Sequence, residues 1–246
     1  FKPETADGTV NVTFTFDGSN LAGKTLVVFE SLERNDTVYA VHTDIHDEAQ
    51  TIYFPEIGTT VKDAVSGTQF SAAGQVSLVD TVSYNNLTPK TEYALKGILM
   101  DQETGKAIIV GEQEVTAETT FTPEEPSGTV DVTFTFDASS LAGHALVVFE
   151  ELYQSEISIA EHKDIKDQGQ TIYIPEIGTI ALDKETGTHN SNPDSKVTIA
   201  DTVTYKGLIP GKEYTVKGTL MDKSAGKELL ADGKPVTAEK TFTAEK

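Results

Sequence analysis

The chain has 246 residues, enough for two ordinary domains or one large all-β domain, and 37% of them are hydrophobic. Its formal net charge of -20 would repel nucleic-acid phosphates, so we expect no nucleic-acid partner. The sequence has no cysteine, which excludes disulfides, thiolate metal sites and cysteine nucleophiles. No apolar run is long enough to cross a bilayer and no leader opens the chain, so we expect a soluble fragment without membrane contact.

The chain repeats itself with a period of about 120 residues, the size of one small domain. The stretch Asp7–Leu32 returns at Ser127–Leu152, and Asp80–Lys106 returns at Asp201–Lys227. In chain order we expect a trailing part of one unit (1–55), a complete unit (56–175) and a leading part of the next unit (176–246). Each end part alone would expose strand edges and half a core, so we expect the two to complete one unit, within one molecule or between neighbours.

The pattern within each unit is typical of short strands. Apolar and polar residues alternate over brief stretches, and turn signals such as NLTPK, DQETGK and PEEPSG separate them. No stretch shows a helical period. The sequence therefore predicts an all-β fold of Ig-like (CnaB-type) β-sandwich repeats in tandem.

Four polar side chains of the complete unit lie on strand faces that are otherwise apolar, where burial is costly unless something satisfies them. They are Thr59, Asp80, Glu150 and Gln170, and the other copy repeats them as Thr179, Asp201, Glu30 and Gln50. A histidine, His162 or His42, precedes each glutamine by a short loop. Each residue has an ordinary alternative, as an acceptor for loop amides, a strand residue or a turn cap. Their occurrence as a set in both copies favours a reaction site.

This set can form a covalent bond between two of its own side chains. A threonine hydroxyl can attack a glutamine carboxamide carbon, expel ammonia and leave an ester. Histidine can act as general base and acid near neutral pH. Two acids in one buried site cannot both ionise cheaply, so one should stay protonated and stabilise the oxyanion. Folding supplies proximity, and one turnover for each site suffices. We therefore expect no turnover enzyme, no cofactor and no metal.

The motifs VVFE (147–150), SLVDTVSYNNLTP (77–89), KGTLMDK (217–223) and AEHKDIKDQGQT (160–171) resemble the VaFE repeats of Gram-positive surface adhesins. The resemblance covers essentially the whole chain. It implies Ig-like stalk domains with autocatalytic Thr–Gln ester bonds between first and last strands, in a secreted protein anchored to the cell wall. The anchor and the tip that would bind a host ligand are absent, so we expect an excised piece whose partners are neighbouring repeats.

Carried over by position, the resemblance implies that Thr59 bonds to Gln170 in the complete unit. Asp80, Glu150 and His162 would assist this bond. In the split unit Thr179 would bond to Gln50, with help from Asp201, Glu30 and His42.

Three alternatives remain open. A Lys–Asn or Lys–Asp isopeptide bond needs an inward lysine, whereas Lys62 aligns with Leu182 and Lys24 with His144. A non-covalent or calcium-stabilised binding module is compatible with the aspartates beside the histidines, although their spacing matches no recognised calcium loop. A hydrolase could use the same residues on an external ester or amide, but no pocket is indicated. The aspartates of the calcium alternative are Asp44, Asp47, Asp164 and Asp167.

Overall fold

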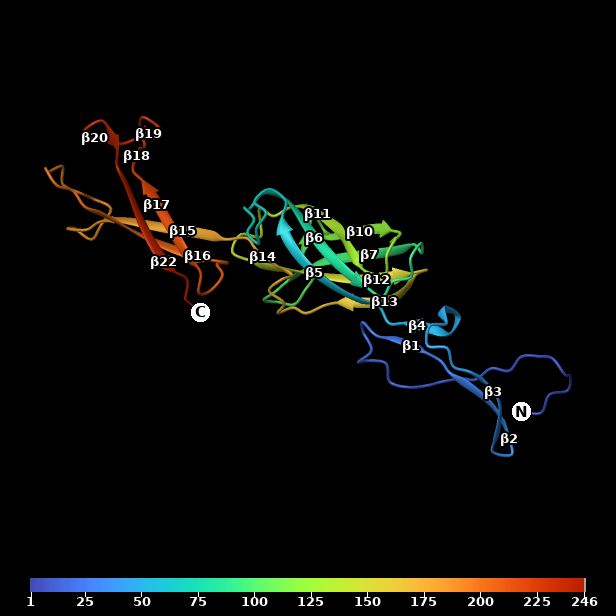
Figure 1. Ribbon diagram of the computed structural model, residues 1–246. Coiled ribbons are helices and arrows are strands. Elements are labelled where there is room, and N and C mark those ends of the chain that lie inside the picture. The colour runs from blue at the N-terminus through green and yellow to red at the C-terminus, as the bar shows by residue number, and fades with distance from the viewer. Residues whose placement is uncertain (246) are drawn as a thin grey trace.

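The structure is a computed structural model and describes residues 1–245. Antiparallel strands and one short 3-10 turn make up its regular structure, which confirms the predicted all-β fold. Figure 1 shows a central sandwich with the N-terminal strands at one end and the C-terminal strands at the other. Residues 1–245 include no helix with the length and apolar character needed to span a membrane.

The central sandwich consists of two antiparallel sheets. One has the order β10-β7-β12-β13, with β14 also paired to β12, and the other has the order β11-β6-β5. A small hairpin, β8-β9, lies outside them. The strands are β5 (Glu56–Asp63), β6 (Gln75–Asn85), β7 (Tyr93–Asp101), β8 (Ile109–Val110), β9 (Gln113–Glu114), β10 (Thr116–Phe121), β11 (Gly128–Asp137), β12 (Ala145–Gln154), β13 (Ile157–His162) and β14 (Thr171–Tyr173).

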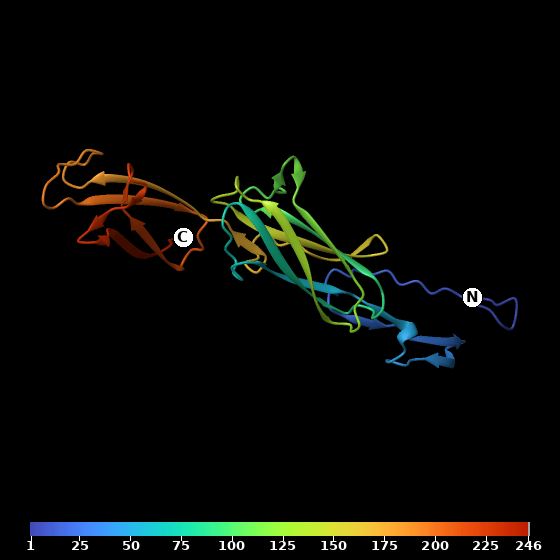
Figure 2. The same ribbon diagram turned by 90° about the horizontal axis from the view of Figure 1, so that it is seen from above.

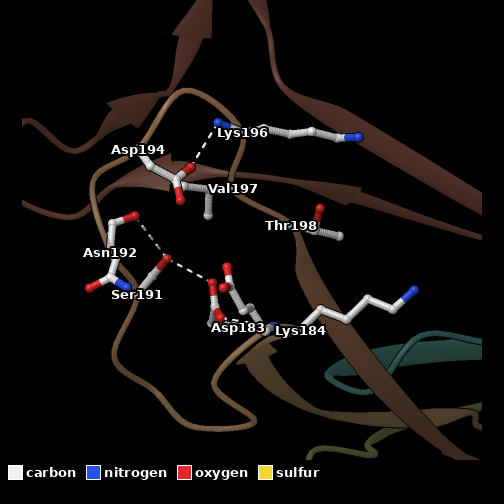
Figure 3. A pocket seen from close by; sticks show the side chains of 9 residues that line it. Asp183, Lys184, Ser191, Asn192, Asp194, Lys196, Val197 and Thr198 are labelled. Atoms are coloured by element: carbon white, nitrogen blue, oxygen red, sulfur yellow. Dashed lines mark hydrogen bonds between the residues drawn. The ribbon is translucent and has the colours of Figure 1, made fainter.

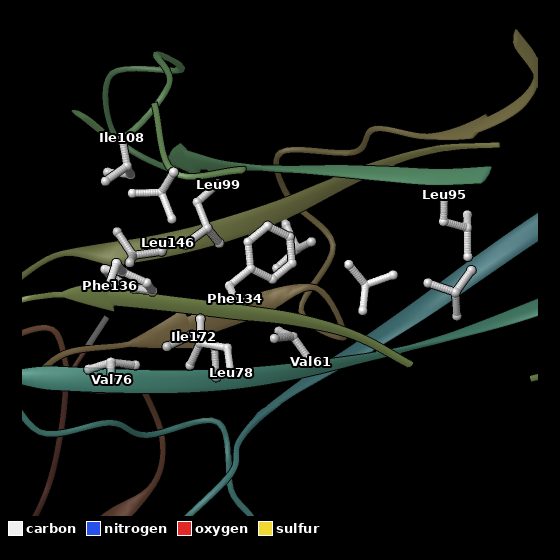
Figure 4. Close-up of a cluster of buried hydrophobic side chains, with 14 of the residues drawn as sticks. Val61, Val76, Leu78, Leu95, Leu99, Ile108, Phe134, Phe136, Leu146 and Ile172 are labelled. Carbon is white, nitrogen blue, oxygen red and sulfur yellow. The ribbon is translucent and has the colours of Figure 1, made fainter. Parts of the chain in front are cut away.

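The core lies between these two sheets because each central strand is apolar on every second residue. β7 alternates buried and half-buried positions along its whole length, and β5 alternates buried positions with exposed or half-buried ones. Phe134 projects from β11 into the middle of the core, where Figure 4 shows it among aliphatic side chains from both sheets. The labelled neighbours around it are Val61, Leu78, Leu99, Leu146 and Ile172.

The N-terminal part contains only paired short strands. β1 pairs with β4, β2 pairs with β3, and residues 1–17 form no strand. The β2–β3 turn places Asn35 and Asp36 at φ 51° and 56°, the left-handed values that a two-residue type I′ hairpin requires. The elements are β1 (Thr25–Val27), β2 (Glu30–Arg34), β3 (Thr37–His42), the 3-10 turn η1 (Glu48–Gln50) and β4 (Thr51–Tyr53).

The C-terminal part consists of pairs of strands, and Tyr205 of one pair lies against Phe242 of another, with ring centroids 4.9 Å apart. β15 pairs with β16 and β17 pairs with β22, and two short ladders, β18-β19 and β20-β21, extend from them. The strands are β15 (Glu176–Asp183), β16 (Ile199–Lys206), β17 (Glu213–Thr219), β18 (Met221–Asp222), β19 (Lys227–Glu228), β20 (Leu230–Ala231), β21 (Lys234–Pro235) and β22 (Thr237–Thr243).

The loop after β15 keeps the local structure of its counterpart after β5. Asp183 accepts hydrogen bonds from the backbone amides of Glu185 and Thr186 and from the hydroxyl of Ser191, as Figure 3 shows for Ser191. Asp63 makes the corresponding bonds after β5. The C-terminal part therefore folds locally in the same way as the first strands of the central sandwich.

The chain enters and leaves the central sandwich at opposite ends of β5. It enters at Glu56, the first residue of β5. It leaves after Tyr173, which exchanges backbone hydrogen bonds with Gln69 and Ser71, beyond the far end of β5. Only two residues separate β4 from β5, and only two separate β14 from β15. Both views accordingly place the two end parts on opposite sides of the sandwich (Figures 1 and 2).

Candidate functional site

Thr59 and Asp80 come from adjacent strands of the three-stranded sheet. Thr59 lies opposite Val82, and Asp80 lies opposite Val61, so the two polar residues are diagonal neighbours on β5 and β6. Both side chains point into the core, where Thr59 is 8% exposed and Asp80 is 0% exposed. The alternation of the strands buries these polar groups together with the apolar residues around them.

Glu150 and Gln170 come from the facing sheet. Glu150 lies on β12, opposite His162 of β13 on one side and Gly97 of β7 on the other. Gln170 immediately precedes β14, and its backbone carbonyl accepts a hydrogen bond from the Val148 amide of β12. The side chains of Glu150 and Gln170 are fully buried.

His162 connects the two sheets at this position. The backbone amide of Thr59 donates to His162 Nδ1 at 3.2 Å, and Gln170 Nε2 donates to the His162 carbonyl oxygen at 3.1 Å. The amide of Val61 also donates to the Gly169 carbonyl at 3.0 Å. The backbone of Thr59, from the opening strand, and the side chain of Gln170, from the closing strand, are therefore both hydrogen-bonded to His162.

Six buried oxygen atoms at this position have no hydrogen-bond partner among the described residues. They are Thr59 Oγ1, both carboxyl oxygens of Asp80, both carboxyl oxygens of Glu150, and Gln170 Oε1. Unpaired buried polar atoms each cost free energy, and they are rare in folded proteins. Within residues 1–245 the only other atom of this kind is Gln50 Oε1, which belongs to the equivalent glutamine. The orphaned atoms are those that an ester-forming reaction uses.

The two carboxyl groups are held away from full ionisation. Burial raises the pKa of Asp80 to about 7, although the adjacent Thr59 hydroxyl and Glu150 carboxyl act in the opposite direction. Burial, together with the charge of Asp80, raises the pKa of Glu150 to about 9. The pair therefore favours a state at neutral pH in which Glu150 keeps its proton.

Gly97 leaves the space that the Glu150 carboxyl occupies. A Cβ atom at this position would lie 2.2 Å from Glu150 Oε1 and 2.5 Å from Phe134 Cζ, closer than any side chain tolerates. Gly97 is not among the site residues predicted from the sequence. The signal was present, because a glycine within a strand often marks a close approach and the other copy keeps it as Gly218.

The ring of His162 has both nitrogen atoms engaged. Nδ1 accepts from the Thr59 amide, so a neutral ring carries its proton on Nε2, which lies 3.2 Å from Asp167 Oδ2. His42 and Asp47 form the same pair in the N-terminal part, at 2.9 Å. The structure thus brings His162 to the site, but its observed contacts position the Thr59 backbone rather than its hydroxyl. Its assignment as the general base stays a prediction.

The second predicted set is divided between the two ends of the chain. Glu30, His42 and Gln50 lie together in the N-terminal part, where Glu30 pairs with His42 and Gln50 Nε2 donates to Glu30 Oε2 at 2.7 Å. Thr179 and Asp201 lie on β15 and β16 of the C-terminal part, and both are exposed. The structure does not bring these two groups together within one copy.

The aspartates considered for calcium each accept a backbone amide two residues ahead, as turn-capping residues do. The bonds run from His46 to Asp44, Ala49 to Asp47, Lys166 to Asp164 and Gly169 to Asp167. Lys62 and Lys24, considered for an isopeptide bond, are exposed. Over residues 1–245, no cluster of three or more metal-ligating side chains is present.

An all-β tandem repeat protein that buries a threonine, a glutamine and two acids side by side in its core has the composition of a self-cross-linking domain. The chain belongs to the family of T-Q ester bond containing domains, whose model matches residues 1–54, 55–174 and 175–246. No curated protein matches the chain.

The solved structures that the comparison finds are distant in sequence, and their TM-scores are below 0.5. A bacterial adhesin from Mobiluncus mulieris, described as containing intramolecular disulfide, isopeptide and ester bond cross-links, is 14% identical, with a TM-score of 0.42 over 78% of this chain and 99% of that chain. A second crystal form of it gives a TM-score of 0.39 over 77% and 94%. A putative beta-galactosidase from Bacteroides fragilis is 15% identical, with a TM-score of 0.34 over 46% of this chain and 17% of that chain.

Replacing Gly97 by alanine should disrupt the site. The new methyl group would overlap Glu150 and Phe134, so we expect a destabilisation of about 1–3 kcal/mol and a displaced Glu150 carboxyl. Chemical denaturation measures the first effect. Gly218→Ala is the matched control, because the nearest atom to its Cβ is the Ala238 carbonyl oxygen at 4.0 Å. Equal destabilisation by the two changes would contradict this account of the glycine.

The raised carboxyl pKa values predict a pH dependence of stability. An acid whose pKa is higher in the folded state stabilises most below its unfolded pKa, and this contribution is lost as the pH rises through the folded value. In a Thr59→Ala variant, which cannot form the ester, we expect the melting temperature to fall between about pH 5 and about pH 9. Adding Glu150→Gln should remove most of this fall. Identical melting profiles for the two variants would refute the buried-acid assignment.

Proposed function

We propose that the chain is a segment of the stalk of a bacterial cell-surface adhesin, in which ester bonds between first and last strands give mechanical and proteolytic resistance. The observation that carries this proposal is the set of orphaned buried oxygens on Thr59, Asp80, Glu150 and Gln170. A binding or purely structural role would leave this cost uncompensated. An irreversible reaction between the residues explains why they are buried together.

The reaction joins Thr59 Oγ1 to the side-chain carbonyl carbon of Gln170. The C–N bond of the carboxamide breaks, and the hydroxyl proton of Thr59 ends on the departing nitrogen, so that one ammonia leaves. The hydrogen bond from Gln170 Nε2 to the His162 carbonyl fixes the orientation of the amide. A protonated Glu150 then donates to the oxygen on which negative charge develops.

We assign the first proton transfer to Asp80, in place of the His162 that the sequence predicts as general base. Its carboxyl lies beside the Thr59 hydroxyl, which lowers its pKa against the effect of burial, so a fraction of it is ionised near neutral pH. His162 acts as a positioning residue, because its ring holds the Thr59 backbone and is itself held by Asp167. Acid, acceptor and nucleophile are thereby fixed before the reaction, which removes most of the entropic cost of bringing them together.

The mechanical role follows from the path of the chain. The polypeptide enters at Glu56 and leaves after Tyr173, and an ester from Thr59 to Gln170 would carry tension across the unit without loading residues 60–169. Closing such a long loop also restricts the unfolded chain, as a disulfide does. The high density of negative charge suits a solvated surface. The proposed location is a Gram-positive cell wall, in a protein of the VaFE-repeat type.

The mass of the intact chain tests the ester directly. We expect the purified protein to weigh less than its sequence by one ammonia for the central bond, and Thr59→Ala to have the full mass. By analogy with a disulfide that closes a loop of this size, the variant should lose about 4–5 kcal/mol of stability. Thr60→Ala is the control, because Thr60 is the exposed neighbour on the same strand. An unmodified mass for the parent chain would refute the proposal.

The roles of Asp80 and His162 can be separated by rate. We expect His162→Ala to slow ester formation enough to follow it by mass, and Asp80→Asn to abolish it. In the His162→Ala protein the rate should rise as the pH passes about 7, where Asp80 ionises, and fall as it passes about 9, where Glu150 loses its proton. A variant Asp80→Asn that bonds at the parent rate would show that Asp80 is not the acceptor.

A further inference from the structure

The two connectors between successive units have the same construction. Phe54 and Pro55 join β4 to β5, and Ile174 and Pro175 join β14 to β15. Both prolines are half-buried, and a proline ring fixes φ at about −65°. Two domains of one chain usually move relative to each other, but a connector of two residues, one of them proline, has few bonds about which they could turn.

A tight turn of the central sandwich contacts the first two strands of the C-terminal part. The His144 amide donates to the Leu141 carbonyl at 3.1 Å and closes this turn. Gly143 occupies its third position with φ 86°, a left-handed value that favours glycine. A Cβ atom on Gly143 would lie 3.2 Å from Glu176 Oε2 and 3.2 Å from Lys206 Cβ. β15 and β16 therefore approach a backbone that has no side chain.

Gly207, in the turn between β16 and β17, contacts the central sandwich from the other side of this junction. Its φ is 67°, and a Cβ atom there would lie 3.2 Å from the Ile174 carbonyl oxygen and 3.3 Å from the carbonyl group of Gly143. Tyr214 holds this turn, because its hydroxyl accepts a hydrogen bond from the Ile209 amide at 3.0 Å. Two glycine backbones are thus in close contact across the junction.

Aromatic rings pack beside the two glycines. The ring of Phe70, from the loop after β5, lies edge to face with Tyr214 of the C-terminal part, with centroids 6.1 Å apart. The same ring contacts Tyr173 at the end of the central sandwich, with centroids 5.7 Å apart. Burial, with a further contribution from Tyr214, raises the pKa of Tyr173. The junction therefore excludes water from part of this ring.

The junction at the other end of the central sandwich has equivalent contacts. Gly23 has φ 74°, and a Cβ atom there would lie 2.6 Å from Glu56 Oε2. Asn86 has the left-handed φ of 61°, and its Nδ2 donates to the Phe54 carbonyl at 3.5 Å. The counterparts of Gly23, Glu56, Asn86 and Phe54 are Gly143, Glu176, Gly207 and Ile174. The complete unit thus makes this contact once with its entry end and once with its exit end (Figures 1 and 2).

We propose that successive units of this chain form a rigid interface, in which the glycine turn of one unit packs against the first strands and the following turn of the next, so that tandem units make a stiff rod with a repeated orientation. The interface needs no ester, so it can be tested apart from the cross-link. Its mechanical consequence rests on the proposed function, because in a stalk a force would reach the next unit without first extending a slack connector.

The experiment measures distances between two spin labels across the second junction. Because the chain has no cysteine, Glu118→Cys and Thr202→Cys supply the only labelling sites, and both positions are exposed on strands. Double electron–electron resonance on the full chain should give one narrow distance distribution. Adding Gly143→Ala should broaden or shift it. Gly111→Ala is the matched control, because Gly111 has φ 58° but nothing lies within 4 Å of its Cβ position, and it should leave the distribution unchanged.

A second variant removes the aromatic contact without altering the backbone of the glycine turn. Phe70→Asn introduces the residue that the C-terminal part has at the equivalent position, Asn190, in a loop of the same local structure. We expect a broader distribution. Intact mass should show the loss of one ammonia in the parent and in every variant, because none of the changes touches the residues to be joined.

The outcomes separate this inference from the proposed function. A broad distribution in the parent chain would overturn the rigid interface, even in a protein that lacks one ammonia. A narrow distribution that Gly143→Ala and Phe70→Asn leave unchanged would refute the contacts assigned to the junction. A narrow distribution that both changes broaden, in a parent chain of full mass, would support the interface and refute the central ester.

Discussion

The structure depends on the burial of four polar side chains whose oxygen atoms have no hydrogen-bond partner among residues 1–245. Thr59, Asp80, Glu150 and Gln170 occupy core positions that aliphatic residues could fill at lower free energy. The surrounding sandwich compensates this cost by packing, and the site stays dry enough to raise the pKa of both acids. Formation of the ester removes the hydroxyl group of the threonine and the amide nitrogen of the glutamine, so these two groups no longer need hydrogen-bond partners. The free energy that the fold loses by burying these groups before the reaction is therefore what brings them together in a dry site where they can react.

The fold supplies the geometry because the site lies where the edges of two sheets meet. The opening strand β5 ends one sheet, the closing strands β13 and β14 end the other, and His162 bonds to both through its ring and its carbonyl. The chain also enters and leaves the sandwich within a few residues of the two that would be joined. In the stalk that we propose, the position that permits the reaction is therefore also the position at which a covalent bond would carry tension past the core.

Much of this could be predicted from the sequence, and the missing part has a physical reason. Alternation with a period of two indicates which side chains share a face, so the all-β fold and the inward direction of Asp80 and Glu150 could be predicted. It does not indicate distances across the core. Three features depend on how the two sheets approach each other. They are the space over Gly97 that the Glu150 carboxyl fills, the contact of His162 with the Thr59 amide, and the pairing of His162 with Asp167. The repeat indicates that the two end parts correspond to different portions of one unit. Their placement on opposite sides of the sandwich depends on the two-residue connectors to β5 and β15.

The most direct measurement is peptide mapping of the purified protein by tandem mass spectrometry. The account predicts a branched peptide in which Thr59 and Gln170 are joined, one ammonia lighter than its two components, and separable by mild alkali as an ester is. Recovery of two linear peptides, with an unmodified threonine and an intact glutamine, would contradict the central claim.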